Sequence, residues 1–98
     1  MVKVNRELEK FFKVYLGLEQ AYDTTGYLRP TLHAFGDGYV SLVRQGLEAV
    51  LRTRALSVAD YERLTDIEFD GEDELYEYLG GMYLYLFEGQ ECQPTPPN

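Results

Sequence analysis

The residues best suited to chemistry lie in one acidic segment, from Asp66 to Glu77. Counted from Asp66, acidic side chains occupy positions 1, 3, 5, 9 and 12, and Gly71 occupies position 6. This spacing is close to that of a calcium-binding helix–loop–helix motif, in which carboxylates coordinate the ion and the glycine permits a sharp turn. Single-site calcium binding is therefore one interpretation of the segment.

Three departures weaken the calcium interpretation. Position 3 is Glu68, where the motif prefers Asp or Asn, and position 8, normally apolar, is Asp73. No second loop of this kind occurs in the chain. Seven carboxylates within twelve residues also exceed the charge that one divalent ion neutralises. We keep calcium binding as the lowest alternative and predict no metal site and no cofactor.

The candidates for catalysis are few. His33 is the only histidine and Cys92 the only cysteine, so neither a disulfide within the chain nor a cysteine-based metal site can form. No residue beside His33 in the sequence resembles an activated nucleophile. We expect a packing or surface role for His33, and we predict that the protein is not an enzyme.

The charge is distributed unevenly. Residues 1–56 contain eight Lys/Arg against six Asp/Glu, whereas residues 57–98 contain eleven Asp/Glu and one basic residue, Arg63. The acidic half would be repelled by phosphates, so we expect no direct binding to nucleic acid. A basic protein is the natural complement of such a surface.

The apolar residues recur at helical spacing. Asn5 is suited to cap a helix from Arg6 to near Tyr22. Asp37 is suited to cap a second helix, which is expected to begin after it and to run to about Thr53. Ser57 and Asp60 have capping-box spacing, which predicts a short helix from Val58 to near Asp66. One additional helical turn is expected near residues 30–35.

The last helix is apolar around most of its circumference. Its main stripe contains Leu75, Leu79, Met82 and Leu86, and Asp70 is suited to cap it. The acids of its first turn complement the positive end of the helix dipole. Gly80-Gly81 projects to the opposite face, which suggests either a contact surface or close packing against a neighbour.

These patterns predict an all-α fold, a compact bundle of four main helices, in a single domain over residues 1–89 with a flexible proline-rich tail over residues 90–98. The predicted core consists of Leu8, Phe11, Phe12, Tyr15, Val43, Leu47, Val50, Leu64, Leu75, Leu79, Met82 and Leu86. No apolar run is long enough to span a membrane, and no signal-peptide pattern occurs. We therefore expect a cytoplasmic protein without membrane contact.

The layout resembles that of bacterial toxin-immunity proteins. Leu8-Glu-Lys-Phe11-Phe12-Lys-Val-Tyr15 in the first helix and Tyr76-Glu77-Tyr78-Leu79 in the last are similar to immunity proteins of contact-dependent growth inhibition, and the acidic, tyrosine-rich helix also resembles the colicin DNase immunity type. The resemblance implies a cytoplasmic protein that neutralises a cognate toxin, often a basic nuclease.

We predict that the acidic segment and nearby tyrosines bind the toxin. The predicted partner contacts are Asp66, Glu68, Asp70, Glu72, Asp73, Glu74 and Glu77, with Tyr76, Tyr78 and Tyr85 as aromatic anchors. An alternative with the same chemistry is a phage protein whose carboxylates mimic DNA phosphates and inhibit a nuclease or a CRISPR effector.

Overall fold

The computed structural model describes residues 5–18 and 20–96. These residues contain five helices. They are α1 (Arg6–Tyr15), α2 (Leu28–His33), α3 (Asp37–Thr53), α4 (Val58–Thr65) and α5 (Glu72–Phe87). The described residues contain no strand. The predicted compact all-α bundle is therefore confirmed, with the expected extra turn present as α2.

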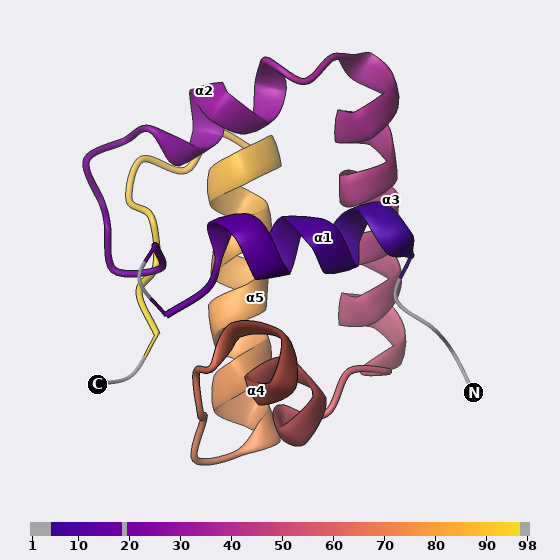
Figure 1. Cartoon of the computed structure of the whole chain (residues 1–98), viewed down its shortest axis with the longest axis vertical. Coiled ribbons are helices and arrows are strands. Elements are labelled where there is room, and N and C mark those ends of the chain that lie inside the picture. Colours follow the sequence, from indigo (N-terminus) through magenta and orange to yellow (C-terminus); the bar gives the residue numbers. More distant parts are fainter. Residues whose placement is uncertain (1–4, 19, 97–98) are drawn as a thin grey trace.

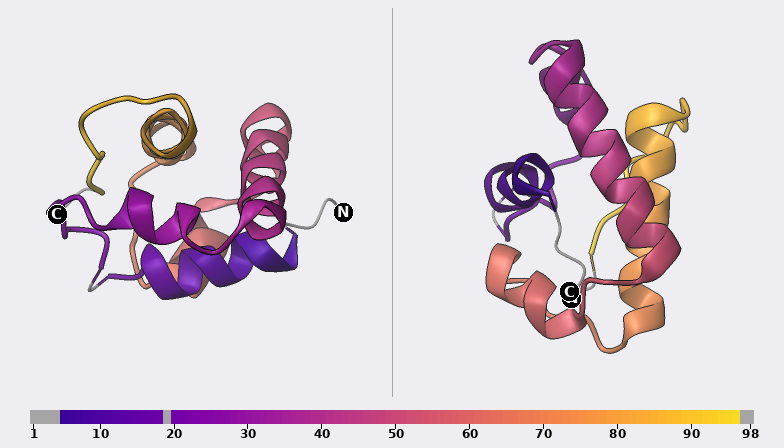
Figure 2. Two further views of the ribbon diagram at one scale, coloured as in Figure 1. Left: turned by 90° about the horizontal axis from the view of Figure 1, so that it is seen from above. Right: turned by 90° about the vertical axis from the view of Figure 1, so that its right-hand side faces the viewer.

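The two longest helices form one layer and the N-terminal helix crosses it. Figure 1 shows α3 and α5 side by side and antiparallel, with α1 crossing in front of them and α4 near the start of α5. The right-hand view of Figure 2 agrees with this arrangement, because α1 is seen nearly end-on to one side of α3 and α5. Packing of α1 against both α3 and α4 closes the core.

Helix α1 ends earlier than its sequence pattern predicts. It stops at Tyr15 and not near Tyr22, because the chain turns at the buried Gly17. The turn lets the backbone N–H of Leu18 donate to the Thr65 carbonyl at the end of α4 (2.9 Å). A tertiary hydrogen bond thus takes the place of a further helical turn.

Two of the four predicted helix caps are confirmed. The Asn5 side chain accepts a hydrogen bond from the Leu8 N–H (2.7 Å), and Ser57 accepts one from the Asp60 N–H (3.0 Å). The predicted Asp37 cap is wrong, because Asp37 is the first residue of α3 and Gly36 is its N-cap. The predicted Asp70 cap is also wrong, because Gly71 is the N-cap of α5 and no side chain caps it there. Without that cap, the acids of the first turn provide the complement to the helix dipole.

The core is larger than the predicted set. Ten of the twelve predicted core residues are buried, while Tyr15 and Leu64 are half-buried. Aromatic rings from three elements contact one another in it: Tyr61 of α4 lies 5.4 Å from Phe12 and 5.7 Å from Phe69, between ring centroids. Both pairs are edge-to-face, the favoured geometry for aromatic side chains.

The described part of the C-terminal segment lies on the body of the protein. The Gln93 side-chain amide donates to the Asp23 carbonyl (3.2 Å), and Pro96 is buried. Pro94 covers Gly81, where an added Cβ would lie 3.4 Å from the proline ring. This distance is ordinary van der Waals contact, so the packing of Pro94 would also admit an alanine at position 81. The flexibility of the tail and the boundary at residue 89 stay predictions.

Gly80 is open, and this gives a prediction about stability. A Cβ at Gly80 would meet nothing within 4 Å, so Gly80→Ala should raise the free energy of unfolding by about 1 kcal/mol through helix propensity alone. The measurement is urea unfolding at neutral pH. The matched variant Gly89→Ala should be destabilised, since Gly89 has a φ of +81° that alanine adopts at a cost. A loss of stability in Gly80→Ala would contradict the open space beside Gly80 on α5.

None of the described helices is both long enough and apolar enough to cross a bilayer.

Candidate functional site

The connector between α4 and α5 separates its acidic residues from its apolar ones. Asp66, Glu68 and Asp70 are exposed, whereas Ile67 and Phe69 are 2% and 3% exposed. Burial of the two apolar side chains fixes the direction of the three carboxylates between and beside them. Acidic and apolar residues alternate in Asp66–Asp70, and this alternation is the sequence pattern that indicates the arrangement.

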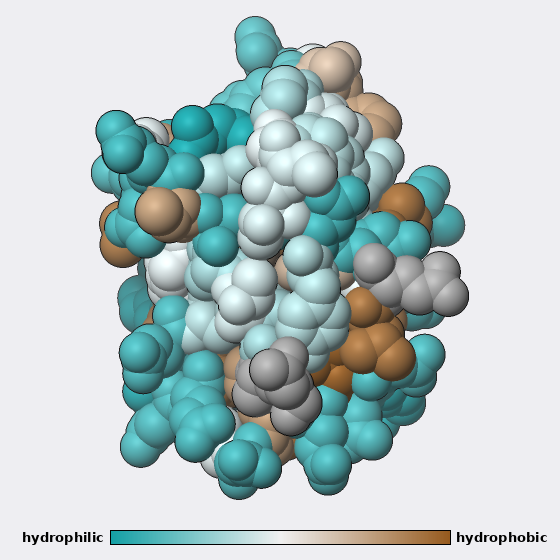
Figure 3. Space-filling view, turned by 90° about the vertical axis from the view of Figure 1, so that its left-hand side faces the viewer, coloured by the Kyte–Doolittle hydropathy of each residue, from teal (hydrophilic) through white to brown (hydrophobic). Residues whose placement is uncertain are grey.

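The first turns of α5 continue the exposed acidic surface. All seven predicted carboxylates are exposed, and the Asp73 side chain is 93% exposed. We name this set the acidic surface: Asp66, Glu68, Asp70, Glu72, Asp73, Glu74 and Glu77. It lies at the end of the molecule that is lowest in Figure 1, and Figure 3 shows hydrophilic side chains around the lower end of the neighbouring face.

One arginine neutralises part of the acidic surface. Arg54, at the C-terminal end of α3, places its guanidinium 2.9 Å from Asp73 and 3.5 Å from Glu72. The same guanidinium lies 5.0 Å from the centre of the Tyr76 ring. The other five carboxylates have no ion pair within residues 5–18 and 20–96. Most of this negative charge is therefore available to a partner.

The predicted aromatic anchors do not lie on this surface. Tyr76, Tyr78 and Tyr85 are only 6%, 5% and 5% exposed. They are covered by Leu56 of the α3–α4 connection, Phe69 of the α4–α5 connector and Arg29 of α2, respectively. The Tyr76 hydroxyl donates to the Leu56 carbonyl (2.7 Å) and accepts from its N–H (3.0 Å). We correct the prediction by assigning these three tyrosines to the core.

The acidic segment does not gather into a chelating loop. Among the described residues, no group of three or more His, Cys, Asp and Glu side chains is arranged to hold a metal ion. This geometry does not favour the calcium alternative. His33, the other candidate for chemistry, contacts the Leu86 carbonyl through Nε2 (2.9 Å) and the Phe87 ring edge, as expected for a packing role.

Two buried tyrosines carry hydroxyls without a normal hydrogen bond. Neither the Tyr61 nor the Tyr78 hydroxyl makes a hydrogen bond of normal geometry in the described part of the chain. Burial raises the pKa of Tyr61 well above its ordinary value of 10, and it raises the pKa of Tyr78 as well. The two phenols lie close enough to influence each other, with ring centroids 6.4 Å apart.

Titration of these phenols predicts an alkaline loss of stability. Above pH 10 the unfolded chain releases both protons while the folded chain retains them, so stability is complete below pH 10 and falls as the pH rises above it. Each buried tyrosine contributes up to about 1.4 kcal/mol per pH unit to that fall. Tyr61→Phe/Tyr78→Phe should therefore lose less stability than the wild type between about pH 8 and about pH 10.5. Equal losses in urea unfolding would contradict the burial of both phenols.

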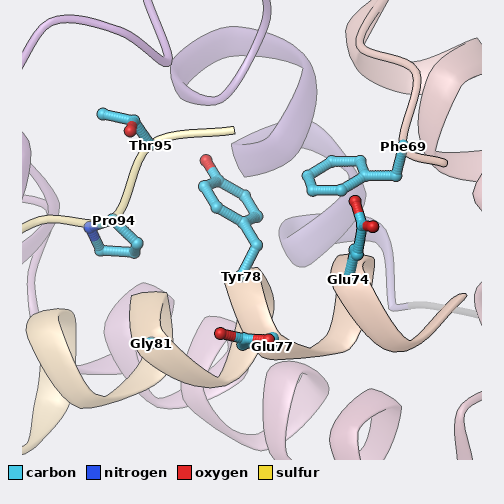
Figure 4. A pocket seen from close by; sticks show the side chains of 7 residues that line it. All are labelled: Phe69, Glu74, Glu77, Tyr78, Gly81, Pro94 and Thr95. Carbon is cyan, nitrogen blue, oxygen red and sulfur yellow. The ribbon is translucent and has the colours of Figure 1, made fainter. Parts of the chain in front are cut away.

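A groove borders the acidic surface on the tail side of α5. It has a volume of about 510 Å³ and is lined by Phe69, Glu74, Glu77, Tyr78, Gly81, Pro94 and Thr95. Figure 4 shows Tyr78 standing between Phe69 and the two tail residues, with its hydroxyl pointing away from α5. The carboxylate of Glu74 lies beside the Phe69 ring.

The sequence did not indicate Arg54, Phe69 or Pro94 as parts of this region, because each reaches it through tertiary packing. The fold and the site together define a small helical protein with an exposed acidic end. No family model, curated protein or solved structure matches the chain.

Proposed function

We propose that this chain is an immunity protein that neutralises a basic, nuclease-type toxin through its acidic surface. The observation that carries the proposal is the acidic surface as a whole: seven exposed carboxylates at one end of the fold against one neighbouring arginine, Arg54. Removing them from water against a neutral partner would be costly, whereas Lys and Arg side chains of a basic partner would compensate them.

The mechanism follows from the charge. A nuclease binds phosphates with a basic groove, and a dense array of carboxylates is complementary to the same groove. The acidic surface would accelerate encounter at low ionic strength and then block access of nucleic acid to the groove. Glu72, Asp73 and Glu74 lie in the first turn of α5, so their backbone is already helical before binding.

Charge reversal provides the experiment. Purified wild-type protein and Glu72→Lys/Asp73→Lys/Glu74→Lys serve as bait in lysate of the source cell, and captured polypeptides are identified by mass spectrometry. Each candidate is then expressed alone and together with the chain. We expect a basic polypeptide that kills the host alone, is tolerated with the wild type, and binds the variant roughly 100-fold more weakly at physiological salt.

The control variant is Glu7→Lys/Glu9→Lys/Asp37→Lys. It makes the same change in net charge and also replaces first-turn acids, but these lie at the starts of α1 and α3. It should retain binding and protection. A captured nuclease or effector that is not toxic to the host would favour the phage-type inhibitor instead, and undiminished binding by the acidic-surface variant would refute both.

A further inference from the structure

The chain turns back on itself after α5. Gly89 has a φ of +81°, a left-handed conformation that glycine adopts without strain, and the Gln90 N–H donates to the Leu84 carbonyl (3.1 Å) around it. Residues 90–96, which we name the C-terminal strap, then run back beside α5 toward the connection between α1 and α2 (Figure 1). A single hinge residue therefore places the strap over one flank of α5.

Two side chains fasten the C-terminal strap to the α1–α2 side of the molecule. Arg29 of α2 donates through Nη2 to the Gln90 carbonyl and through Nε to the Tyr85 carbonyl of α5 (2.7 Å). The side-chain amide of Gln93 donates to the Asp23 carbonyl in the α1–α2 connection (3.2 Å). The strap thus ties α2 and the α1–α2 connection to α5.

The prolines of the C-terminal strap make its apolar contacts. Pro94 lies against Gly81, with its ring 3.4 Å from the position that a Cβ would take, and Pro96 is buried. Pro94 and Thr95 line the groove together with Tyr78, whose side chain rises from α5 toward them (Figure 4). Removal of the strap would therefore uncover the outer end of Tyr78.

The C-terminal strap has fewer stabilising contacts than the helices have. It contains no helix or strand, and Glu91, Cys92 and Thr95 are exposed. The Oε1 atom of Gln93 is buried without a hydrogen-bond partner in the described part of the chain, so it loses its hydration on closure without compensation. Segments of this kind open at lower free energies than the core of the same protein.

We propose that the C-terminal strap is a clasp with two states. The closed state is the one in the structure, and in the open state the strap swings about Gly89 while the five helices stay folded. Opening releases the α1–α2 connection from α5 and exposes Tyr78 in the groove. Because Glu74 and Glu77 line the same groove, the strap forms one wall beside the acidic surface, and its position determines the shape of that wall.

Two neighbouring glycines of α5 provide a matched pair of variants. In Gly81→Leu the added side chain extends into the position of the Pro94 ring and should hold the strap open. In Gly80→Leu the same change meets open space and should leave the strap closed. Leucine is a good helix former, so α5 is retained in both variants.

A nitroxide attached to Cys92 reports the position of the strap. Cys92 is the only cysteine of the chain, and its side chain is exposed. In ¹⁵N-labelled protein the nitroxide should broaden the amide resonances of Asp23 and Gly81 in the wild type. Gly80→Leu should retain this broadening, and in Gly81→Leu the resonances of Asp23 and of the neighbours of position 81 should lose most of it. Equal broadening in the two variants would overturn the proposal.

Nitration of tyrosines by tetranitromethane, mapped by mass spectrometry, distinguishes opening of the clasp from unfolding. In Gly81→Leu, Tyr78 should be nitrated roughly tenfold faster than in the wild type. Tyr76 should remain protected, because its hydroxyl is held by the Leu56 carbonyl on another side of α5. Equal acceleration at Tyr76 and Tyr78 would show that the strap is part of the core, and unchanged nitration of Tyr78 would show that the strap is not its cover. Either result would overturn the clasp.

A second pair of variants changes the strap itself and leaves the helices intact. Pro94→Ala/Pro96→Ala removes the apolar contacts of the strap and should accelerate nitration of Tyr78. Glu91→Ala/Cys92→Ala changes two exposed positions and should not. Equal nitration of Tyr78 in these two variants would contradict the clasp even if Gly81→Leu failed to fold. All of these measurements use the chain alone, so they are independent of the proposed function.

Discussion

Phe12→Ala is expected to lower the free energy of unfolding by about 3–5 kcal/mol, which is a large part of the stability of a domain of this size. The Phe12 ring is fully buried and meets the edge of Tyr61 with centroids 5.4 Å apart. It therefore joins α1 to α4 at the centre of the core. Truncation removes apolar burial and leaves a cavity between the two helices.

Urea unfolding at neutral pH, followed by far-ultraviolet circular dichroism, measures this loss. Val14→Ala is the control, because Val14 lies on the same helix and is 46% exposed. It should change stability by less than about 1 kcal/mol. A Phe12→Ala variant as stable as Val14→Ala would show that α1 does not pack across the bundle as described.

Gly46→Ala is expected to be destabilising by about 2 kcal/mol, although alanine is the better helix former. An added Cβ would lie 2.3 Å from Asn5 Nδ2 and 3.2 Å from Leu8 Cβ. Asn5 caps α1 and also donates to the Leu42 carbonyl (2.8 Å), so it joins the start of α1 to α3. The methyl group would displace this cap from both partners.

A double-mutant cycle identifies the cause. Asn5→Ala alone should cost about 1 kcal/mol through loss of the cap, and Asn5→Ala/Gly46→Ala should cost less than the sum of the single changes. The control Gly38→Ala lies in the same helix with nothing within 4 Å and should be neutral or stabilising. Strict additivity would contradict the contact between Asn5 and Gly46.

Helical periodicity was sufficient for the elements with strong local signals. Helix α3 ends at the predicted Thr53 and begins one residue before the predicted start, and Ser57 caps α4 as its spacing predicted. Predictions from local sequence signals were wrong where tertiary contacts determine the backbone conformation. Gly17 turns the chain toward α4 and ends α1 seven residues before the predicted end, and nothing near Gly17 in the sequence encodes its hydrogen-bonded neighbour Thr65.

The exposure of the carboxylates in the candidate site could be predicted from the sequence, whereas the burial of its tyrosines could not. Carboxylates in a dense run must remain hydrated unless they are paired, so the exposure of Asp66–Glu77 follows from composition. Tyrosine is amphipathic and suits either an interface or a core, and helical projection could not choose between them. Tyr76 and Tyr85 became core residues because Leu56 and Arg29, distant in sequence, lie against them.

The measurement that decides most directly whether the acidic surface binds a basic partner is the dissociation constant of the captured partner at physiological salt. It should be determined for the wild type, for Glu72→Lys/Asp73→Lys/Glu74→Lys and for the control Glu7→Lys/Glu9→Lys/Asp37→Lys. We expect roughly 100-fold weaker binding for the first variant and less than about threefold for the control. Equal dissociation constants for the two variants would contradict the role of the acidic surface.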